Sequence, residues 1–263
     1  MNNNSIIHPD ARIGKDVEIG PFCCIAGNVE IGDGCKIGPH VTILDYVKLG
    51  KNCTVAAGAV LGGIPQDLKY AGEVTWVEIG DNTVIREYVT INRGTAASGK
   101  NLTKVGSNCL IMSYVHIAHD CVVGDRCILA SYTGLAGEVV LDERANIGGG
   151  VLIHQFCHIG SYTMLGGGNT VNKDVPPFAM ASRSPVVYEG LNLVGMRRNG
   201  FSNEVIAEVK EMYRLIYLGG MGVAAACDAI RETFPVSAHR DMVLAFVENS
   251  VACGRGIIKC PVK

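Results

Sequence analysis

This sequence has neither a large excess of charge of one sign nor a long apolar run, and we expect no secretory signal. Its 263 residues carry a formal net charge of -2, so no basic surplus favours binding to nucleic acid or to an anionic membrane. No apolar run is long enough to span a membrane. The N-terminal MNNNSIIHPD also lacks the basic stretch and apolar core of a secretory signal. We therefore expect a cytoplasmic protein with neither a nucleic acid partner nor an integral membrane segment.

A six-residue repeat is the dominant feature of the chain. An aliphatic residue recurs at every sixth position, twelve times in succession, from Val105 to Val171, and the same spacing runs from Ile7 to Leu61. A period of six matches neither one face of a helix nor a simple alternating strand, and it indicates a repeat architecture. Short strands joined by tight corners would stack as coils about 4.8 Å apart, each burying its apolar edge against the next.

The hexads resemble the hexapeptide repeats of left-handed parallel β-helices. In that family three hexads make one triangular coil of 18 residues, and only this resemblance implies the left-handedness. The fourth residue after each aliphatic one is usually small, and seven of the 11 cysteines occupy this position: Cys23, Cys35, Cys53, Cys109, Cys121, Cys127 and Cys157. We expect buried free thiols there, and no metal site, because no CxxC pair exists.

Two interruptions of the repeat predict loops. The repeat lapses between Leu61 and Ile79, an interval of 18 residues, so we expect one coil's worth of chain to leave the regular path. A second interruption over residues 92–104 shifts the phase of the repeat by two and therefore requires an insertion. Each loop is either a ligand contact or a tolerated surface insertion.

Pro176 and Pro177 end the repeat. The sequence therefore predicts a mainly β protein, with a left-handed parallel β-helix of hexapeptide repeats over residues 1–177. A connecting segment and a C-terminal α-helical domain would occupy residues 178–263.

Within this second part, residues 178–200 look irregular. Ser202 is a good N-cap for a first helix, which Gly219-Gly220 ends. Residues 223–234 and 239–249 predict two further helices, which would cap the prism or pack against another subunit.

A cluster of titratable residues marks one corner of the repeat. The segment HIAHDC holds His116 and His119, followed directly by Asp120. Histidine is the usual general base for a hydroxyl nucleophile, and an adjacent carboxylate orients its ring and stabilises the imidazolium. We favour catalysis over a purely structural pair of histidines because the cluster lies on a rigid scaffold.

The length of the coil predicts what stacks beside His119. Steps of 18 and 36 residues lead from His119 to Gly137 and Gln155, with His154 next to Gln155 and about 10 Å from the base. A column of this kind suits a long substrate. The backbone N–H of Gly137 would serve as an oxyanion donor, and the alternative of a simple corner glycine is equally compatible with the sequence.

Six short motifs carry a closer resemblance as an ordered set. They are PQDLKYAGE (65–73), HIAHDC (116–121), LAGE (135–138), HQFC (154–157), DVPP (174–177) and RRNGFS (197–202). Together they resemble the acyl-[acyl-carrier-protein]--UDP-N-acetylglucosamine O-acyltransferase family over essentially the whole chain. The resemblance implies transfer of an (R)-3-hydroxyacyl chain from acyl carrier protein to the 3-hydroxyl of UDP-N-acetylglucosamine, the first step of lipid A biosynthesis. It also implies a homotrimer with sites between subunits, and no metal or dissociable cofactor.

The same resemblance implies a role for each matching residue. His119 would be the general base, Asp120 would orient it, and Gly137 would donate to the oxyanion. The other implied contacts are Asp67, His116 and Gln155 for the sugar and thioester arm; Lys69, His154, Asn192 and Arg198 for the nucleotide or pantetheine; and Met164 and Gly167 for the acyl chain. This chain departs from the family at Glu138, where a histidine commonly follows LAG.

Three other functions compete with this interpretation. An N-acyltransferase of the same pathway would normally carry an additional N-terminal uridine-binding domain, and the hexads that start at Ile7 argue against it. A sugar or amino-acid acetyltransferase would accept acetyl-CoA and ignore acyl carrier protein. A non-catalytic β-helix scaffold would tolerate the loss of His119.

Overall fold

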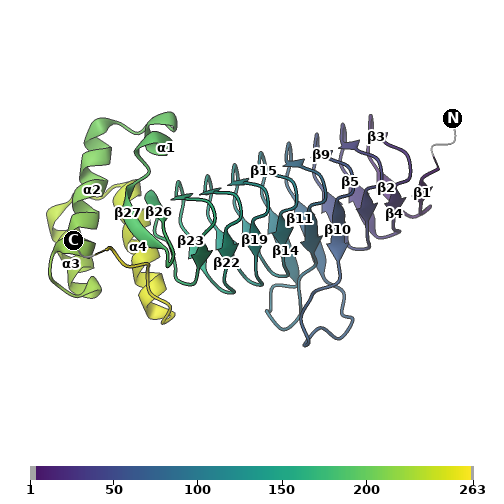
Figure 1. Ribbon diagram of the computed structural model, residues 1–263. Helices are drawn as coiled ribbons and strands as arrows, with labels where there is room; N and C mark the ends of the chain where they lie inside the picture. The colour runs from purple at the N-terminus through teal and green to yellow at the C-terminus, as the bar shows by residue number, and fades with distance from the viewer. Residues whose placement is uncertain (1–3, 262–263) are drawn as a thin grey trace.

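The computed structural model describes residues 4–261 and shows a long three-sided prism of stacked coils (Figure 1). Successive coils contribute short strands to three sheets, and each coil pairs in parallel with the coil before it and the coil after it. The C-terminal helices cover one end of the prism (Figure 1). The repeat architecture predicted from the hexads is therefore confirmed.

We name the sheets A, B and C in the order in which the chain enters them. Sheet A holds β1 (Ile6–Ile7), β4 (Cys24–Ile25), β7 (Thr42–Ile43), β10 (Val60–Gly63), β13 (Thr90–Asn92), β16 (His116–Ile117), β19 (Gly134–Leu135), β22 (Leu152–Ile153) and β25 (Thr170–Val171). Sheet B holds β2 (Arg12–Ile13), β5 (Val29–Ile31), β8 (Val47–Leu49), β11 (Trp76–Ile79), β14 (Leu102–Val105), β17 (Val122–Val123), β20 (Val140–Leu141) and β23 (His158–Ile159). Sheet C holds β3 (Glu18–Ile19), β6 (Lys36–Ile37), β9 (Thr54–Val55), β12 (Val84–Ile85), β15 (Leu110–Ile111), β18 (Ile128–Leu129), β21 (Asn146–Ile147), β24 (Met164–Leu165), β26 (Ala179–Ser182) and β27 (Val187–Leu191).

The repeating aliphatic residues fill the interior of the prism. Each stacks in register on its equivalent in the next coil, as Ile117 does on Leu135, and both are fully buried. The seven cysteines at the small position are also buried and free, as expected. Ile7 and Ile13 remain 41% and 37% exposed because the first coil has a neighbour on one side only.

Both loops leave the edge between sheets A and B, one coil apart (Figure 1). Leu61 of β10 and Ile79 of β11 are 18 positions apart, whereas the equivalent Ile43 and Leu49 are six apart, so the first insertion adds 12 residues. The expectation that a whole coil leaves the path is therefore wrong. The chain passes directly from sheet A to sheet B, and the insertion of two hexads at one corner preserves the phase.

A hairpin of β26 and β27 follows the two prolines. β26 pairs in parallel with β24, so sheet C continues beyond residue 177, and β27 pairs antiparallel with β26. The expectation that residues 178–200 are irregular is therefore wrong. The strands of the hairpin and the six-residue α1 (Leu193–Arg198) are each too short to show a strand or helix periodicity in the sequence.

The three predicted C-terminal helices are confirmed as α2 (Asn203–Leu218), α3 (Val223–Thr233) and α4 (Ala238–Ala252). Ser202 caps α2 by accepting a hydrogen bond from the backbone of Val205, and Gly219 ends it. The helices are fixed to the prism by buried contacts, among them the hydroxyl of Ser250, which donates to Asp174 over 2.7 Å. Within residues 4–261, no helix is long and apolar enough to cross a membrane.

We predict that Leu129→Ala lowers the free energy of unfolding by about 2–5 kcal/mol, because its buried side chain has coils on both sides that cannot collapse into the cavity. Thr54→Ala, on the exposed outer face of β9, is the matched control and should change stability by less than about 0.5 kcal/mol. Urea unfolding followed by circular dichroism measures both. Equal effects would contradict a tightly packed interior.

Candidate active site

A groove of about 410 Å³ lies at the edge from which the two loops emerge. His116 and His119 line it together with Gly137, Gln155 and Gln66 of the first loop. The structure thus brings the predicted column of His119, Gly137 and Gln155 into one cavity. Gln66 was not singled out from the sequence, although it lies inside the PQDLKYAGE motif.

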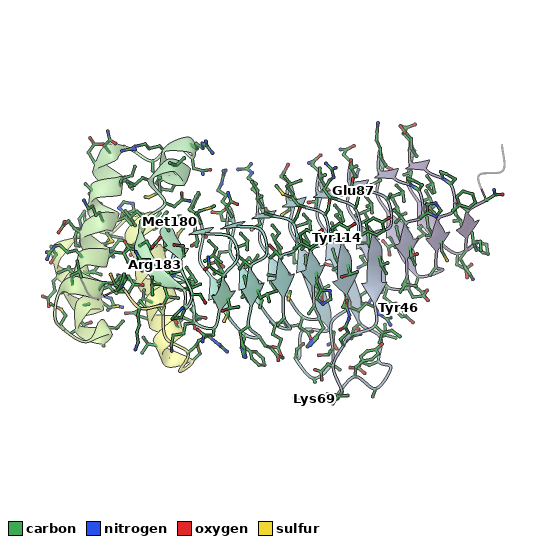
Figure 2. All side chains as sticks on the ribbon, viewed as in Figure 1. Tyr46, Lys69, Glu87, Tyr114, Met180 and Arg183 are labelled. Atoms are coloured by element: carbon green, nitrogen blue, oxygen red, sulfur yellow. The ribbon has the colours of Figure 1, made fainter. Side chains whose placement is uncertain are left out.

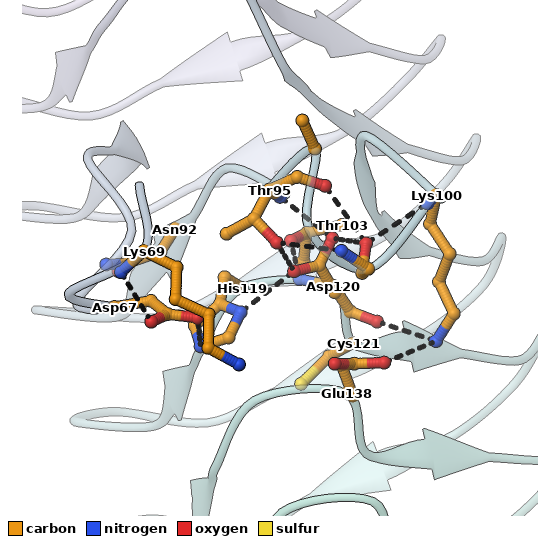
Figure 3. A network of polar contacts seen from close by, with 12 residues as sticks. Asp67, Lys69, Asn92, Thr95, Lys100, Thr103, His119, Asp120, Cys121 and Glu138 are labelled. Carbon is orange, nitrogen blue, oxygen red and sulfur yellow. Dashed lines mark hydrogen bonds and ion pairs between the residues drawn. The ribbon is translucent and has the colours of Figure 1, made fainter. Parts of the chain in front are cut away.

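His119 and Asp120 form a buried pair at the corner after β16 (Figure 3). Nδ1 of His119 lies 2.8 Å from Oδ2 of Asp120. The carboxylate of Asp120 acts only as an acceptor, because three other groups already donate to it. Nδ1 of His119 therefore carries the proton of this hydrogen bond, and Nε2 is left as an acceptor. Nε2 also lies 3.9 Å from Oδ2 of Asp67, a first-loop carboxylate that would attract an imidazolium.

The second loop holds Asp120 in place. Its fully buried carboxylate accepts hydrogen bonds from the backbone N–H of Thr95 at 2.8 Å, from the Thr95 hydroxyl at 2.7 Å and from the Ser98 hydroxyl at 2.6 Å. The backbone N–H of Asp120 donates to the Thr103 hydroxyl at 2.8 Å. The loop therefore supports the His119–Asp120 pair and is not merely a tolerated insertion.

Sequence reasoning missed these hydroxyl residues. The available signal was positional: the loop that carries Thr95 and Ser98 leaves the same edge of the prism, one coil before Asp120. A buried carboxylate requires donors, and small hydroxyl residues in the adjacent insertion are the nearest source.

Gly137 is required by the ring of His119. A Cβ atom at this position would lie 2.5 Å from both Cε1 and Nε2 of the imidazole. The positive φ of this corner falls on Glu138, at 61°, so the turn itself does not need a glycine at 137. Among residues 4–261, the N–H of Gly137 donates to no acceptor. The close approach of the imidazole therefore explains this glycine, and the oxyanion role of its N–H stays a prediction.

His116 lies on the outer face of sheet A, next to the pair. Its Nδ1 is 2.7 Å from the hydroxyl of Thr90. Burial lowers the pKa of His116, and the nearby His119 lowers it further. His116 is therefore neutral at neutral pH and suited to hydrogen bonding with a sugar.

Lys69 belongs to the projecting first loop (Figure 2). Its backbone N–H donates to Oδ1 of Asp67 at 2.9 Å, which fixes the direction of that carboxylate, while its side chain is exposed.

The remaining predicted site residues do not line the groove of their own chain. Met164 points outward from sheet C, and Gly167 lies at the corner between sheets C and A. Asn192 caps α1, accepting from Gly195 and donating to the carbonyl of Tyr162, and Arg198 is in the last turn of that helix. His154 is exposed, with Nδ1 3.0 Å from the carbonyl of Gln155.

Metal ligation has no candidate cluster in this part of the molecule. Within residues 4–261, no group of three or more His, Cys, Asp or Glu side chains is arranged to hold a metal ion.

Stacked hexads around such a groove define the hexapeptide-repeat transferases. The sequence matches the family described as bacterial transferase hexapeptide (six repeats) at residues 10–45, 28–63 and 102–137. Residues 174–258 match the family described as Udp N-acetylglucosamine O-acyltransferase; Domain 2.

Individual relatives are more specific. The acyl-[acyl-carrier-protein]--UDP-N-acetylglucosamine O-acyltransferase of Alkalilimnicola ehrlichii is 44% identical over 98% of this chain and 99% of its own. That of Paracidovorax citrulli is 49% identical over 88% of each. A crystal structure of the UDP-N-acetylglucosamine acyltransferase from Bacteroides fragilis matches with a TM-score of 0.93 and 47% identity, covering 97% of this chain and 98% of the other.

The chain therefore belongs to the acyl-[acyl-carrier-protein]--UDP-N-acetylglucosamine O-acyltransferase family, and it is an enzyme. The fold class expected from the sequence, a left-handed parallel β-helix with a C-terminal helical region, is confirmed.

We predict that Gly137→Ala lowers acyl transfer by about 10²-fold or more, because the added methyl group must displace the ring of His119. Gly222→Ala is the matched control, since no atom lies within 4 Å of its added Cβ, and it should retain activity. Initial rates and thermal melting measure the two effects separately. Full activity of a folded Gly137→Ala protein would show that the ring is not held as described.

Proposed function

We propose that the protein transfers an (R)-3-hydroxyacyl chain from acyl carrier protein to the 3-hydroxyl of UDP-N-acetylglucosamine, the first step of lipid A biosynthesis. The observation that carries the chemistry is the hydrogen bond between His119 and Asp120, with the imidazole of His119 lining the groove directly against Gly137. The names of the relatives supply the donor and the acceptor. The cytoplasmic location expected from the sequence is part of this proposal.

In the proposed reaction His119 acts as the general base. Its Nε2 takes the proton of the 3-hydroxyl while the oxygen attacks the thioester carbonyl, and Asp120 stabilises the imidazolium. The N–H of Gly137 donates to the oxyanion of the tetrahedral intermediate. Collapse of that intermediate breaks the carbon–sulfur bond, and the imidazolium returns its proton to the leaving thiolate. The acyl group passes directly to the sugar, with no acyl-enzyme, metal or dissociable cofactor.

The groove also offers groups to position the substrates. Neutral His116 and the side chain of Gln155 provide hydrogen-bonding groups on the same wall. Asp67 and Lys69 approach from the first loop, where the carboxylate is the nearer to His119. We assign Asp67, His116 and Gln155 to the sugar and the thioester arm, and Lys69 to the nucleotide or pantetheine.

Two stacked corners made of glycines offer space for the acyl chain. Gly148, Gly149 and Gly150 stack beneath Gly166, Gly167 and Gly168 in the next coil. A Cβ at Gly167 would lie 2.9 Å from the carbonyl oxygen of Gly149, so two successive corners present bare backbone. We assign Gly167 and the outward-facing Met164 to the acyl chain, in a space that a larger residue at 167 would shorten.

We further propose a homotrimer in which neighbouring subunits complete each site. His154, Asn192, Arg198, Met164 and Gly167 lie outside the groove of their own chain, so a second copy would have to bring them to it.

An aromatic edge offers a surface for such contacts. The stacked rings of Tyr88, Tyr114 and Tyr132, with centroids 5.3 and 5.0 Å apart, lie along the edge between sheets C and A and are 54%, 49% and 65% exposed. Figure 2 labels Tyr114, the middle ring of the three. Rows of half-exposed tyrosines are typical of subunit interfaces.

The proposed function predicts that His119→Ala lowers transfer to UDP-N-acetylglucosamine by about 10²- to 10⁴-fold, the usual contribution of a general base. His40→Ala, at an exposed corner of an early coil, is the control and should keep full activity. Acyl carrier proteins loaded with a series of 3-hydroxyacyl chains serve as donors, with acetyl-CoA alongside. A wild-type protein that ignores every acyl carrier protein but uses acetyl-CoA would replace this proposal with an acetyltransferase.

The shared site predicts complementation between two inactive variants. His119→Ala and Arg198→Ala should each be inactive alone. Co-expressed trimers should recover up to about a quarter of wild-type activity, because random mixing leaves some interfaces with both native residues. Sedimentation of the same samples reports the oligomer. A trimer without any recovery would place Arg198 in the site of its own chain.

A further inference from the structure

Lys100 connects the second loop to two successive corners of the prism (Figure 3). Its ammonium group donates to the backbone carbonyl of Asp120 at 3.3 Å and lies 3.9 Å from the carboxylate of Glu138. Its backbone N–H donates at 3.1 Å to the hydroxyl of Ser98, which itself binds the carboxylate of Asp120. One side chain therefore contacts both the corner that carries His119 and Asp120 and the corner that carries Gly137 and Glu138.

The two corners are already stacked by the backbone. The N–H of Glu138 donates to the carbonyl of His119 at 2.9 Å. Asp120 and Glu138 occupy equivalent positions in successive coils, each with φ at 61°. The link through Lys100 adds a side-chain clamp on the outer side of this stack, where Gly137 lies against the imidazole.

An exposed ion pair contributes little to stability, and the side chains of Lys100 and Glu138 are 38% and 22% exposed. Any functional effect of this ion pair must therefore come from its location beside the candidate site. The ammonium group of Lys100 lies beside a corner at which Asp67, Asp120 and Glu138 gather three carboxylates.

We propose that the Lys100–Glu138 pair is a positioning element of the site: it clamps the corner that carries Gly137 beneath the corner that carries His119 and balances the charge around the base. This inference rests on the proposed function of His119 as general base. Lys100 and Glu138 do not touch the reacting atoms and act through the two corners.

The two members of the pair act oppositely on His119. A nearby cation repels a positive charge on the imidazole and a nearby anion attracts it, so Lys100 and Glu138 act oppositely on the charge that the proposed reaction develops at His119. The titratable and charged groups that face the base are His116 of β16, Asp67 and Lys69 of the first loop, Lys100 of the second loop, Asp120, and Glu138 of the next corner. Only Lys100 and Glu138 can be changed without removing a group that the proposed reaction uses.

The test is the pH profile of kcat/KM for Lys100→Met, Glu138→Gln and the double variant. Loss of the cation should move the acid limb to higher pH by about 0.3–0.5 unit, and loss of the anion should move it to lower pH by a similar amount. The limb of the double variant should lie near that of the wild type. All three should show kcat lowered by about 3- to 10-fold with KM nearly unchanged, because the clamp is lost while the binding groups remain.

Lys48 and Glu78 provide a matched control. They form an ion pair at 3.3 Å between neighbouring strands of sheet B, with side chains 45% and 40% exposed, away from the groove. Lys48→Met and Glu78→Gln should shift neither the limb nor kcat.

Two results would overturn the inference. Shifts in the same direction, or none, in an active enzyme would show that the pair does not act on the base. A large rise in KM for UDP-N-acetylglucosamine in Glu138→Gln alone would make that residue a substrate contact. A wild-type protein that transfers no acyl group from acyl carrier protein would instead contradict the proposed function, which the His119→Ala comparison identifies separately.

Discussion

The parallel hydrogen bonding of each coil to the next is the constraint on which everything else depends. It places each strand residue beside its equivalent in the next coil, as the pairing of His116 with Gly134 and of Ile117 with Leu135 shows. The corners between the strands are aligned in the same way. A residue 18 positions farther along therefore lies directly on top of its equivalent wherever the coil is regular. The candidate active site follows this order, because His119 and Gly137 are equivalent residues of adjacent coils.

A regular coil by itself would leave Asp120 without donors. The carboxylate is fully buried, and burial of a charged group without hydrogen bonds is costly. The donors come from Thr95 and Ser98 in an insertion that breaks the repeat. The regular coils thus determine where the corner residues lie, and the inserted loops contribute polar groups that contact them. The first loop does the same, since it brings Asp67 to within 3.9 Å of the other ring nitrogen of His119.

Glycine has different physical roles along the edges of the prism. At most corners the residue with positive φ is not glycine: tyrosine, arginine and aspartate adopt it as well. Gly137 is instead required by the close approach of an imidazole, and a Cβ at Gly167 would lie 2.9 Å from the carbonyl oxygen of Gly149 at the preceding corner. Composition alone could not separate these cases, because a glycine needed for φ and one needed for space look the same in a sequence.

The hexads determined the coil, its interior residues and the column of His119, Gly137 and Gln155, because a fixed period converts sequence distance directly into spatial distance. The helix ends at Ser202 and Gly219 could also be predicted from the sequence, since capping is a local interaction. Only the tertiary structure decided what breaks the period: that the first loop inserts at a single corner, that β26 continues sheet C, and that Thr95, Ser98 and Lys100 gather around Asp120. An insertion has no register, so the place where its side chains meet the prism depends on packing between segments that the sequence does not relate.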